Sequence, residues 1–308
     1  MLSVVIPSYN EKGLVLKASQ RLSEILSEAG IVYELIFVDD GSRDTTWEEI
    51  CIASENNDAV KGISFSRNFG KESAIFAGLE MASGECCAVI DCDLQHPPEK
   101  LVDMYNLWQQ GYEIVNGVKE DRGRESAAHG FAAKCFYKLM SNAINIDMSR
   151  SSDFKLMDRK VVNVLLSLSE RKTFFRALVG WAGYKSVDVP FCVEERTEGA
   201  THFSTKALFK YAISNITSYS SAPMQIVTVL GSIFLFFSVI LGIQTFIKHL
   251  LGNAADGFTT VILLLLIIGS IQMIGLGIIG YYISQIFIEC KARPRYLISR
   301  QCGKDFTK

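Results

Sequence analysis

Two aspartates with one residue between them, Asp91 and Asp93, are the side chains in this sequence best suited to chemistry. Residues 86–90, directly before them, form a short apolar run that is typical of a buried strand. Ligands of open α/β sheets bind in the crevice beyond the carboxyl ends of the strands. Such a crevice can hold Mg²⁺ through one or two carboxylates together with substrate phosphates. The pair therefore predicts a metal–diphosphate site, although the same spacing also occurs in ordinary surface turns.

Alternating strands and helices must position this pair. The apolar patterns predict strands at residues 2–7, 33–38, 61–66 and 86–90, and helices at 14–29, 45–54 and 72–81. This alternation favours an α/β fold with a mostly parallel sheet that helices cover on both faces. Polar loops follow the first, second and fourth strands. In such a sheet these three loops meet at one edge, which is the strongest physical argument for a site there.

The rest of the domain has a mixed pattern up to residue 203. We expect helices at 101–108, 127–145, 161–168 and 174–184, and strands at 113–118 and 187–193. Pro190 restricts the last strand to the edge of a sheet, because proline cannot donate to the ladder. Asp153 adds a further carboxylate, which we expect to stand before a strand.

Two uncharged apolar runs, 224–246 and 261–288, are each long enough to cross a bilayer. The flanks carry more positive charge than the link, which has Lys248 and His249 as its basic residues. The positive-inside tendency therefore places both flanks in the cytoplasm and the link outside. Residues 205–219 are amphipathic and predict an interfacial helix, with a core-facing surface helix as the alternative. Glycines in the second run would allow close packing on the first span or on another subunit.

Composition limits the remaining choices. The formal net charge of −2 gives no indication of a nucleic-acid partner. The mean hydropathy of +0.21 is high for a soluble protein, and the excess lies after Pro223. The eight cysteines do not have the spacing of a zinc or redox motif, so we expect free thiols in a reducing compartment. The start of the sequence shows no basic leader or cleavage site, and we expect the amino-terminal domain to stay in the cytosol.

Four segments together resemble the family 2 glycosyltransferases of GT-A fold. They are Ile6-Pro7-Ser8-Tyr9-Asn10-Glu11, Val38-Asp39-Asp40-Gly41-Ser42, Arg67-Asn68-Phe69-Gly70-Lys71 and Asp91-Cys92-Asp93-Leu94-Gln95-His96-Pro97-Pro98. More narrowly, the chain looks like the polyisoprenyl-phosphate glycosyltransferases, the group of dolichyl-phosphate mannose synthases and bactoprenol glucosyltransferases. Residues 153–159, 178–181 and 289–296 and the two carboxy-terminal spans are similar to the glucosyltransferase branch.

The resemblance implies four parts: a cytosolic GT-A domain at 1–203, an interfacial helix at 204–222, a two-helix transmembrane hairpin at 223–290 and a cytosolic tail at 291–308. It implies a multi-pass protein of the bacterial inner membrane, and we expect a homo-oligomer. The implied nucleotide contacts are Pro7, Tyr9, Glu11, Val38 and Asp40, the last accepting a hydrogen bond from the base. The alternative for Pro7 and Tyr9 is that they are ordinary turn residues without a role in binding.

The resemblance also implies that Asp91 and Asp93 bind the diphosphate through Mg²⁺ or Mn²⁺, with Gln95 beside them and Lys119 near the phosphates. The alternative for Lys119 is a solvated loop charge. Asp153 would stand at the reaction centre, as a base or as an orienting group, unless it caps a local turn.

The residues expected to bind the acceptor phosphate depart from the family pattern. Relatives carry a basic residue and a serine upstream of Phe136-Tyr137, where this chain has His129 and Ala133. The loop that begins at Arg196 has His202 in place of the family's lysine. A neutral imidazole brings one donor and no charge, so the assignment of Arg122, His129 and Arg196 to this phosphate is the weakest part of the resemblance.

The implied reaction is transfer of one sugar, with inversion, from a nucleotide diphosphate sugar to undecaprenyl or another polyprenyl phosphate. Glucose from uridine diphosphate (UDP) glucose is the first choice, with galactose, N-acetylated sugars and mannose open. A processive polysaccharide synthase would need Gln-x-x-Arg-Trp and more spans. A silent lipid-binding scaffold would tolerate loss of the carboxylates, all of which are present. A dehydrogenase would have Gly-x-Gly-x-x-Gly after the first strand, which is absent.

Overall fold

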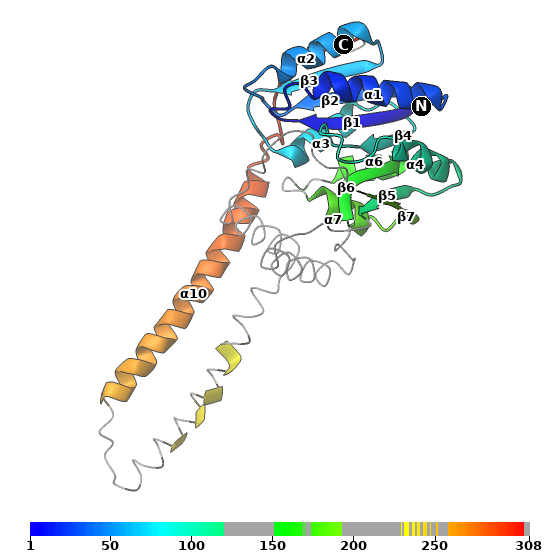
Figure 1. Ribbon diagram of the computed structural model, residues 1–308. Coiled ribbons are helices and arrows are strands. Elements are labelled where there is room, and N and C mark those ends of the chain that lie inside the picture. The colour runs from blue at the N-terminus through cyan, green and yellow to red at the C-terminus, as the bar shows by residue number, and fades with distance from the viewer. Residues whose placement is uncertain are drawn as a thin grey trace. The chain divides into compact units, whose positions relative to one another are not determined.

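The computed structural model describes residues 1–119, 151–168, 170, 174–192 and 258–304, with separate residues between 229 and 251. The chain divides into two compact units, Met1–Thr205 with Pro294–Lys308, and Lys206–Arg293. The first unit contains β1 (Leu2–Ser8), α1 (Val15–Glu28), β2 (Tyr33–Asp39), α2 (Thr46–Asn56), β3 (Val60–Phe65), α3 (Lys71–Met81), β4 (Cys86–Val89), α4 (Lys100–Gln109), β5 (Ile114–Lys119), β6 (Ser151–Asp158), α6 (Arg159–Ser167), α7 (Phe175–Trp181), β7 (Ser186–Phe191) and β8 (Ile298–Cys302) (Figure 1). The second contains α10 (Phe258–Cys290).

Eight strands form one sheet in the order β7-β5-β6-β4-β1-β2-β3-β8. The pairs β1–β2, β1–β4, β2–β3 and β5–β7 are parallel, whereas β6 and β8 run antiparallel to their neighbours. The prediction of a mixed α/β fold with a mostly parallel sheet is confirmed. The predicted edge strand with Pro190 is also confirmed, because β7 lies at the end of the sheet and pairs with β5.

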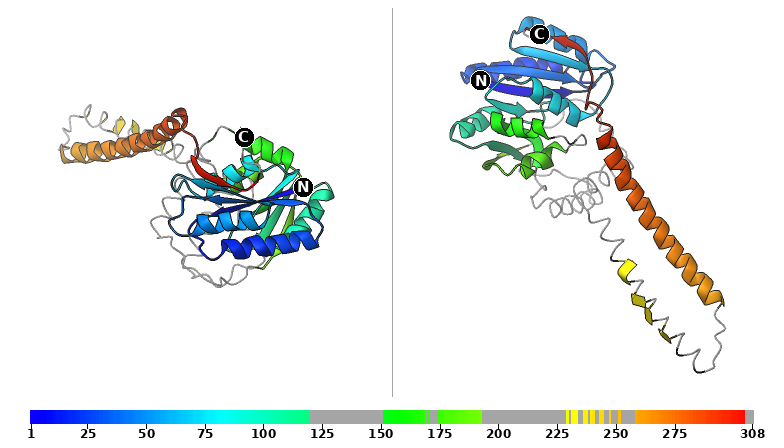
Figure 2. Two further views of the ribbon diagram at one scale, coloured as in Figure 1. Left: turned by 90° about the horizontal axis from the view of Figure 1, so that it is seen from above. Right: turned by 180° about the vertical axis from the view of Figure 1, so that it is seen from behind.

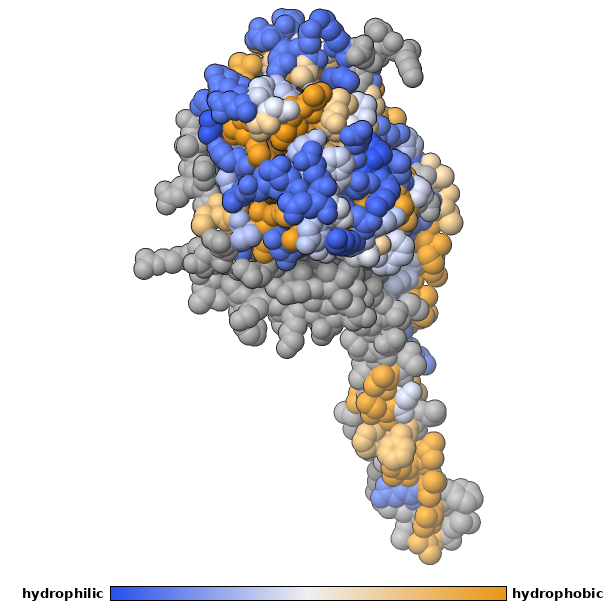
Figure 3. Space-filling model, turned by 90° about the vertical axis from the view of Figure 1, so that its right-hand side faces the viewer, coloured by the Kyte–Doolittle hydropathy of each residue, from blue (hydrophilic) through white to orange (hydrophobic). Residues whose placement is uncertain are grey.

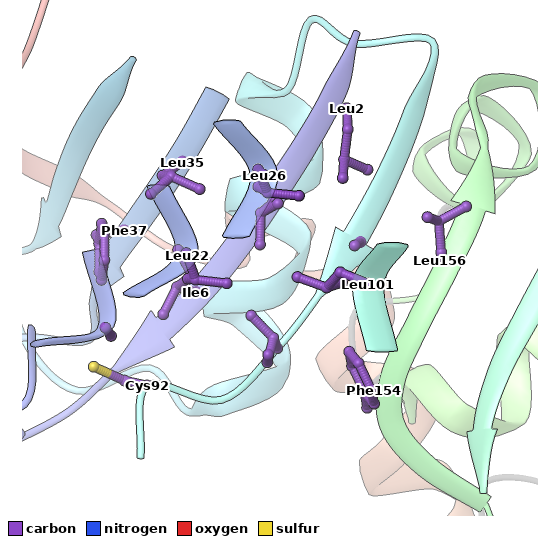
Figure 4. Close-up of a cluster of buried hydrophobic side chains, with 14 of the residues drawn as sticks. Leu2, Ile6, Leu22, Leu26, Leu35, Phe37, Cys92, Leu101, Phe154 and Leu156 are labelled. Carbon is purple, nitrogen blue, oxygen red and sulfur yellow. The ribbon is translucent and has the colours of Figure 1, made fainter. Parts of the chain in front are cut away.

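Helices cover both faces of the sheet. The blue helices α1 and α2 lie on one face and the green helices α6 and α7 on the other (Figure 2). Because both faces are covered, every residue of β1 is buried, as expected for a parallel strand with no solvent face. Side chains of β1, β2, β6, α1 and α4 meet in the core on the first face (Figure 4).

The expectation that Asp153 stands before a strand is wrong. Asp153 is the third residue of β6, which begins at Ser151. The cause is long-range pairing, since β6 is held between β4 and β5. Its register on β4 pairs Val89 with Lys155, and the same register continued for two residues brings Asp153 opposite Asp91. The antiparallel strand therefore carries its carboxylate to the carboxyl end of β4.

The segment after α10 returns to the eight-stranded sheet as β8, antiparallel to β3. The sequence predicted only a cytosolic tail here. The ring of Tyr296 stacks on Phe65 with 4.9 Å between centroids, and the guanidinium of Arg295 lies 4.6 Å from the centre of the Phe76 ring. Residues 294–304 thus belong to the packing of the catalytic unit.

Apolar side chains of α10 are largely exposed within its own unit (Figure 3). Among the residues that the structure describes, one helix is long and apolar enough to cross a membrane, Ile267–Cys290. It overlaps the second predicted span, 261–288, and ends two residues beyond it. The predicted helices at 127–145 and 205–219 lie outside the described residues, as does most of the first predicted span.

Candidate active site

The loops after β1, β2 and β4 meet at one edge of the sheet, as predicted. Ser8 and Asp39 end β1 and β2 as register partners, and the amide of Asp40 donates to the carbonyl of Ser8 at 2.9 Å. The amide of Ile90 donates to Val5 at 3.1 Å, which draws the end of β4 against β1. These bonds therefore bring the polar loops together at one edge of the sheet.

The residues predicted to contact the nucleotide lie together on the β1 and β2 loops. Pro7 and Val38 are buried register partners, and Tyr9 beside them is 42% exposed. The amide of Glu11 donates to the hydroxyl of Thr46 at 2.8 Å, which fixes the β1 loop on α2. An exposed ring above a rigid, buried floor suits stacking on a base. The nucleotide contacts themselves stay a prediction.

Asp40 joins the β2 loop to the start of α3. Its carboxylate accepts from the amides of Phe69 at 2.6 Å and Gly70 at 2.9 Å. Burial raises the pKa of Asp40, and these two amides act against that rise. Gly41 has φ +68, and a Cβ there would lie 2.5 Å from the carbonyl carbon of Arg67. A carboxylate can accept about four hydrogen bonds. Asp40 therefore still has acceptor positions for a hydrogen bond from a nucleotide base.

The centre of the edge is a cluster of four charged side chains. The ammonium Nζ of Lys71 lies 2.6 Å from Oδ1 of Asp91 and 2.9 Å from Oδ2 of Asp153. Arg176 binds Asp153 with two parallel bonds, Nε to Oδ1 at 2.6 Å and Nη2 to Oδ2 at 2.9 Å. This fork geometry is the strong form of the arginine–carboxylate pair. The cluster joins α3, the β4 loop, β6 and α7.

The electrostatics of the cluster keep Asp153 ionised. Burial would raise the pKa of Asp153, but the charges of Lys71 and Arg176 outweigh it and hold the pKa well below its usual range. Burial likewise opposes the charge on Lys71, whose pKa is nevertheless raised by Asp91 and Asp153. A carboxylate held in this way is a poor proton acceptor, so the geometry favours an orienting role over a base.

The segment after Asp91 has a strained backbone. Leu94 has φ +53, which is uncommon for a residue with a side chain and is often found at functional sites. The turn lets the amide of Gln95 donate to Oδ1 of Asp93 at 3.1 Å. Nδ1 of His96 is buried, has no hydrogen-bond partner among the residues that the structure describes, and lies 4.0 Å from Oδ2 of Asp91. An orphaned buried donor or acceptor beside two carboxylates is a polar position that a ligand could satisfy.

Comparison with known proteins assigns the family. The model described as glycosyl transferase family 2 matches residues 3–166. The chain belongs to this family. A prophage bactoprenol glucosyl transferase homolog of Escherichia coli K12 is 34% identical over 301 residues, 97% of this chain and 98% of that protein. The bactoprenol glucosyl transferase of Shigella phage SfV is 33% identical over 98% of this chain and 99% of its own length.

A solved structure shares the fold. Glucosyl-3-phosphoglycerate synthase of Mycobacterium tuberculosis, crystallised with Mn²⁺, UDP and glucosyl-3-phosphoglycerate, superimposes with a TM-score of 0.50 at 20% identity. The match covers 71% of this chain and 79% of that one. The GT-A-like architecture of this family 2 glycosyltransferase therefore agrees with the sheet described above.

Three residues of this glycosyltransferase site were not predicted from the sequence: Lys71, His96 and Arg176. Lys71 and His96 lie in two of the segments that resemble the family and Arg176 lies in a predicted helix, but the sequence indicates no role for any of them. The signal for Lys71 was its place directly after Gly70, at the end of the loop that joins the third strand to the next helix. Lys119, the last residue of β5, is exposed. Arg122, His129 and Arg196 lie outside the described residues, and their roles stay predictions.

Glu72, an acidic residue beside the cluster, provides a test of how pH affects stability. Glu72 accepts the amide of Phe175 at 2.8 Å, and burial, reinforced by the charge of Asp153, raises its pKa from 4.5 to about 7. The folded state therefore binds more protons than the unfolded state between these values, so stability falls as pH rises through this window. Glu72→Gln keeps the acceptor oxygen and removes the charge. We expect it to gain about 1–2 kcal/mol of stability above neutral pH and nothing at acid pH.

The measurement is the thermal unfolding midpoint of the full chain in detergent across this pH range. Glu55→Gln, at an exposed position of α2, is the matched control and should shift the midpoint at no pH. A Glu72→Gln gain of the same size at acid and alkaline pH would contradict the raised pKa.

Proposed function

We propose that this glycosyltransferase transfers a single glucose, with inversion, from UDP-glucose to a polyprenyl phosphate at the cytosolic face of the bacterial inner membrane. The observation that carries the proposal is the junction of Asp91 and Asp153 through Lys71. Through Lys71, Asp91, which we expect to hold the metal and diphosphate, lies close to Asp153, which we expect at the reaction centre. The two bactoprenol glucosyl transferases, alike over nearly the whole chain, support the lipid acceptor and the sugar.

A divalent cation fits the residues at this edge. Asp91 and Asp93 offer hard oxygen ligands on a turn, Gln95 adjoins them, and an ammonium already lies 2.6 Å from Asp91. Within the described part of the chain, there is no group of three histidine, cysteine or acidic side chains that would bind a metal unaided. That agrees with a Mg²⁺ or Mn²⁺ site completed by substrate phosphates. The Mn²⁺ and UDP bound to the mycobacterial synthase support the same cofactor.

Asp91 and Asp93 would hold the metal, which would offset negative charge on the leaving diphosphate. The acceptor phosphate is already ionised near neutral pH, so the reaction does not depend on a strong base. Asp153 raises the pKa of Lys71 and orients both Lys71 and Arg176 at the point where an anionic acceptor would arrive. Prearranged cations of this kind lower the cost of bringing two phosphates together.

The membrane part would bring the acceptor to this site. Ile267–Cys290 is long and apolar enough to cross the bilayer, and the run 224–246 would form the other half of a hairpin. Both spans and the interfacial helix would keep the crevice at the membrane surface, where a lipid phosphate can reach it. The search for the acceptor then takes place in two dimensions.

The deciding experiment incubates membranes that contain the full chain with undecaprenyl phosphate and a panel of labelled nucleotide sugars. We expect labelled lipid from UDP-glucose, with Mg²⁺ or Mn²⁺ present, and none when undecaprenol replaces its phosphate. Labelled lipid formed from another nucleotide sugar would change the assignment of the transferred sugar. If no donor in the panel labels the lipid, the chain is better explained as a lipid-binding scaffold.

A further inference from the structure

Lys71 occupies a position that the metal-dependent reaction also requires. Its ammonium is shared between Asp91 at 2.6 Å and Asp153 at 2.9 Å. Oδ1 of Asp91, which it contacts, is an oxygen that a divalent cation would take as a ligand. Two cations cannot share one carboxylate oxygen at these distances without strong repulsion. A metal that took this oxygen would therefore displace the ammonium.

The backbone of Lys71 is fixed, while its side chain is partly exposed and can reach other rotamers once an ion pair is broken. Gly70, directly before it, has φ +98 and donates its amide to Asp40. The amide of Phe69 donates to the same carboxylate, so the start of α3 is tied to the β2 loop. The lysine side chain itself is 43% exposed, and its stem has four rotatable carbons. The ammonium can thus move while the Cα stays in place.

Asp91 and Asp153 differ in how well their charge would be compensated if Lys71 moved away. Asp153 has the fork of Arg176 on both oxygens and is only 8% exposed. Asp91 is 26% exposed and faces the turn that carries Asp93. A cation arriving from solvent meets Asp91 first, and Asp153 remains compensated if the ammonium shifts. The weaker hold on Lys71 is therefore its bond to Asp91.

We propose that Lys71 is a displaceable internal cation: it neutralises Asp91 until the metal arrives, and is then released to the Asp153 side, where it binds the acceptor phosphate. This proposal rests on the proposed function and adds an order of binding, with the metal before the acceptor. Once Asp91 and Asp93 held a metal and the donor diphosphate, the ammonium of Lys71 would be available to the acceptor phosphate. Acceptor binding before the metal is disfavoured, because Lys71 is then engaged by Asp91.

The inference predicts that replacing Lys71 strengthens metal binding and weakens sugar transfer. Lys71→Met removes the competitor for Asp91 and keeps the length of the stem. It should tighten binding of Mn²⁺ alone by about tenfold, within the usual range for coupling between two sites. The same variant should lose about a hundredfold in transfer rate, as for removal of one donor to a developing or bound anion. Its KM for undecaprenyl phosphate should rise, while its affinity for UDP at saturating Mn²⁺ stays within a few-fold of wild type.

The experiment measures Mn²⁺ binding by electron paramagnetic resonance and transfer kinetics on the purified full chain in detergent. Lys71→Arg keeps the charge and should retain the wild-type Mn²⁺ affinity with partial activity. Lys71→Gln replaces Lys71→Met if the latter does not fold. Lys100→Met, in an exposed ion pair with Asp103 on α4, is the matched control and should change neither reading.

Unchanged or weaker Mn²⁺ binding by both Lys71→Met and Lys71→Gln would overturn the inference, because removing a cation that competes with the metal for Asp91 must tighten the metal site. A tighter metal site with unchanged KM for the acceptor would overturn the assignment of the released ammonium to the acceptor phosphate. If the wild type binds no Mn²⁺ and transfers sugar in chelator, the metal-dependent function fails first, and the inference fails with it.

Discussion

Replacing Asp93 with asparagine is expected to lower the rate of sugar transfer by roughly two to four orders of magnitude. Asp93 lies on the turn directly after Asp91, where its Oδ1 accepts the amide of Gln95. Asparagine keeps the size and that acceptor oxygen, but it removes the charge that a hard divalent cation needs. The loss corresponds to roughly 3–5 kcal/mol of transition-state stabilisation. Folding should survive, because one of two crowded carboxylates becomes neutral.

The measurement compares lipid-linked sugar formation by purified wild type and Asp93→Asn, with Mg²⁺ or Mn²⁺ and with chelator. Asp103→Asn provides the control, since this aspartate lies on α4 in an exposed pair with Lys100. It should retain the wild-type rate. Wild-type activity that persists in chelator, or an Asp93→Asn rate within a few-fold of wild type, is incompatible with the metal-dependent reaction.

The architecture around Asp91 could be predicted because it is local in the sequence. Residues 2–90 alternate between strand and helix patterns, and right-handed crossovers then leave little choice for a parallel sheet. The meeting of the β1, β2 and β4 loops follows from that topology alone. The length of the uncharged apolar run 261–288 also located α10 within three residues at its start and two at its end.

The antiparallel strands could not be predicted in the same way. Nothing in residues 151–158 indicates that they enter the sheet between β4 and β5, and nothing in 298–302 indicates the pairing of β8 with β3. Those contacts join positions far apart in the chain, and their energy lies in tertiary packing rather than local propensity. The position of Asp153 within β6 was misjudged for this reason.

The same limit applies to the charged cluster. Lys71 and Arg176 are distant in sequence from each other and from Asp153, and no spacing rule brings them together. The sequence marked Asp91 and Asp153 as acidic residues but left open whether Asp153 is a base or an orienting group. The two-bond fork of Arg176 and the contact with Lys71 supply the missing argument. They favour the orienting role.

That role leads to the second large effect. Asp153→Asn should lower the transfer rate by about two to three orders of magnitude. The substitution removes the counter-charge of Arg176 and Lys71, so the two cations are no longer held toward the acceptor. Because these cations hold the pKa of Asp153 well below its usual range, the residue stays ionised throughout the working range of the enzyme. The loss should therefore be the same at every pH between about 5 and 8.

The measurement is the ratio of kcat for wild type and Asp153→Asn across that range, with Asp188→Asn, an exposed aspartate of β7, as the control that keeps the wild-type rate. The ratio cancels the ionisation of the acceptor phosphate, which affects both proteins equally. For a general base that titrates within the range, the ratio would fall toward one at acid pH, because wild type would then lose the same charge that the variant lacks. A constant, large ratio identifies Asp153 as the residue that positions Lys71 and Arg176, and a ratio that collapses at acid pH would restore the base.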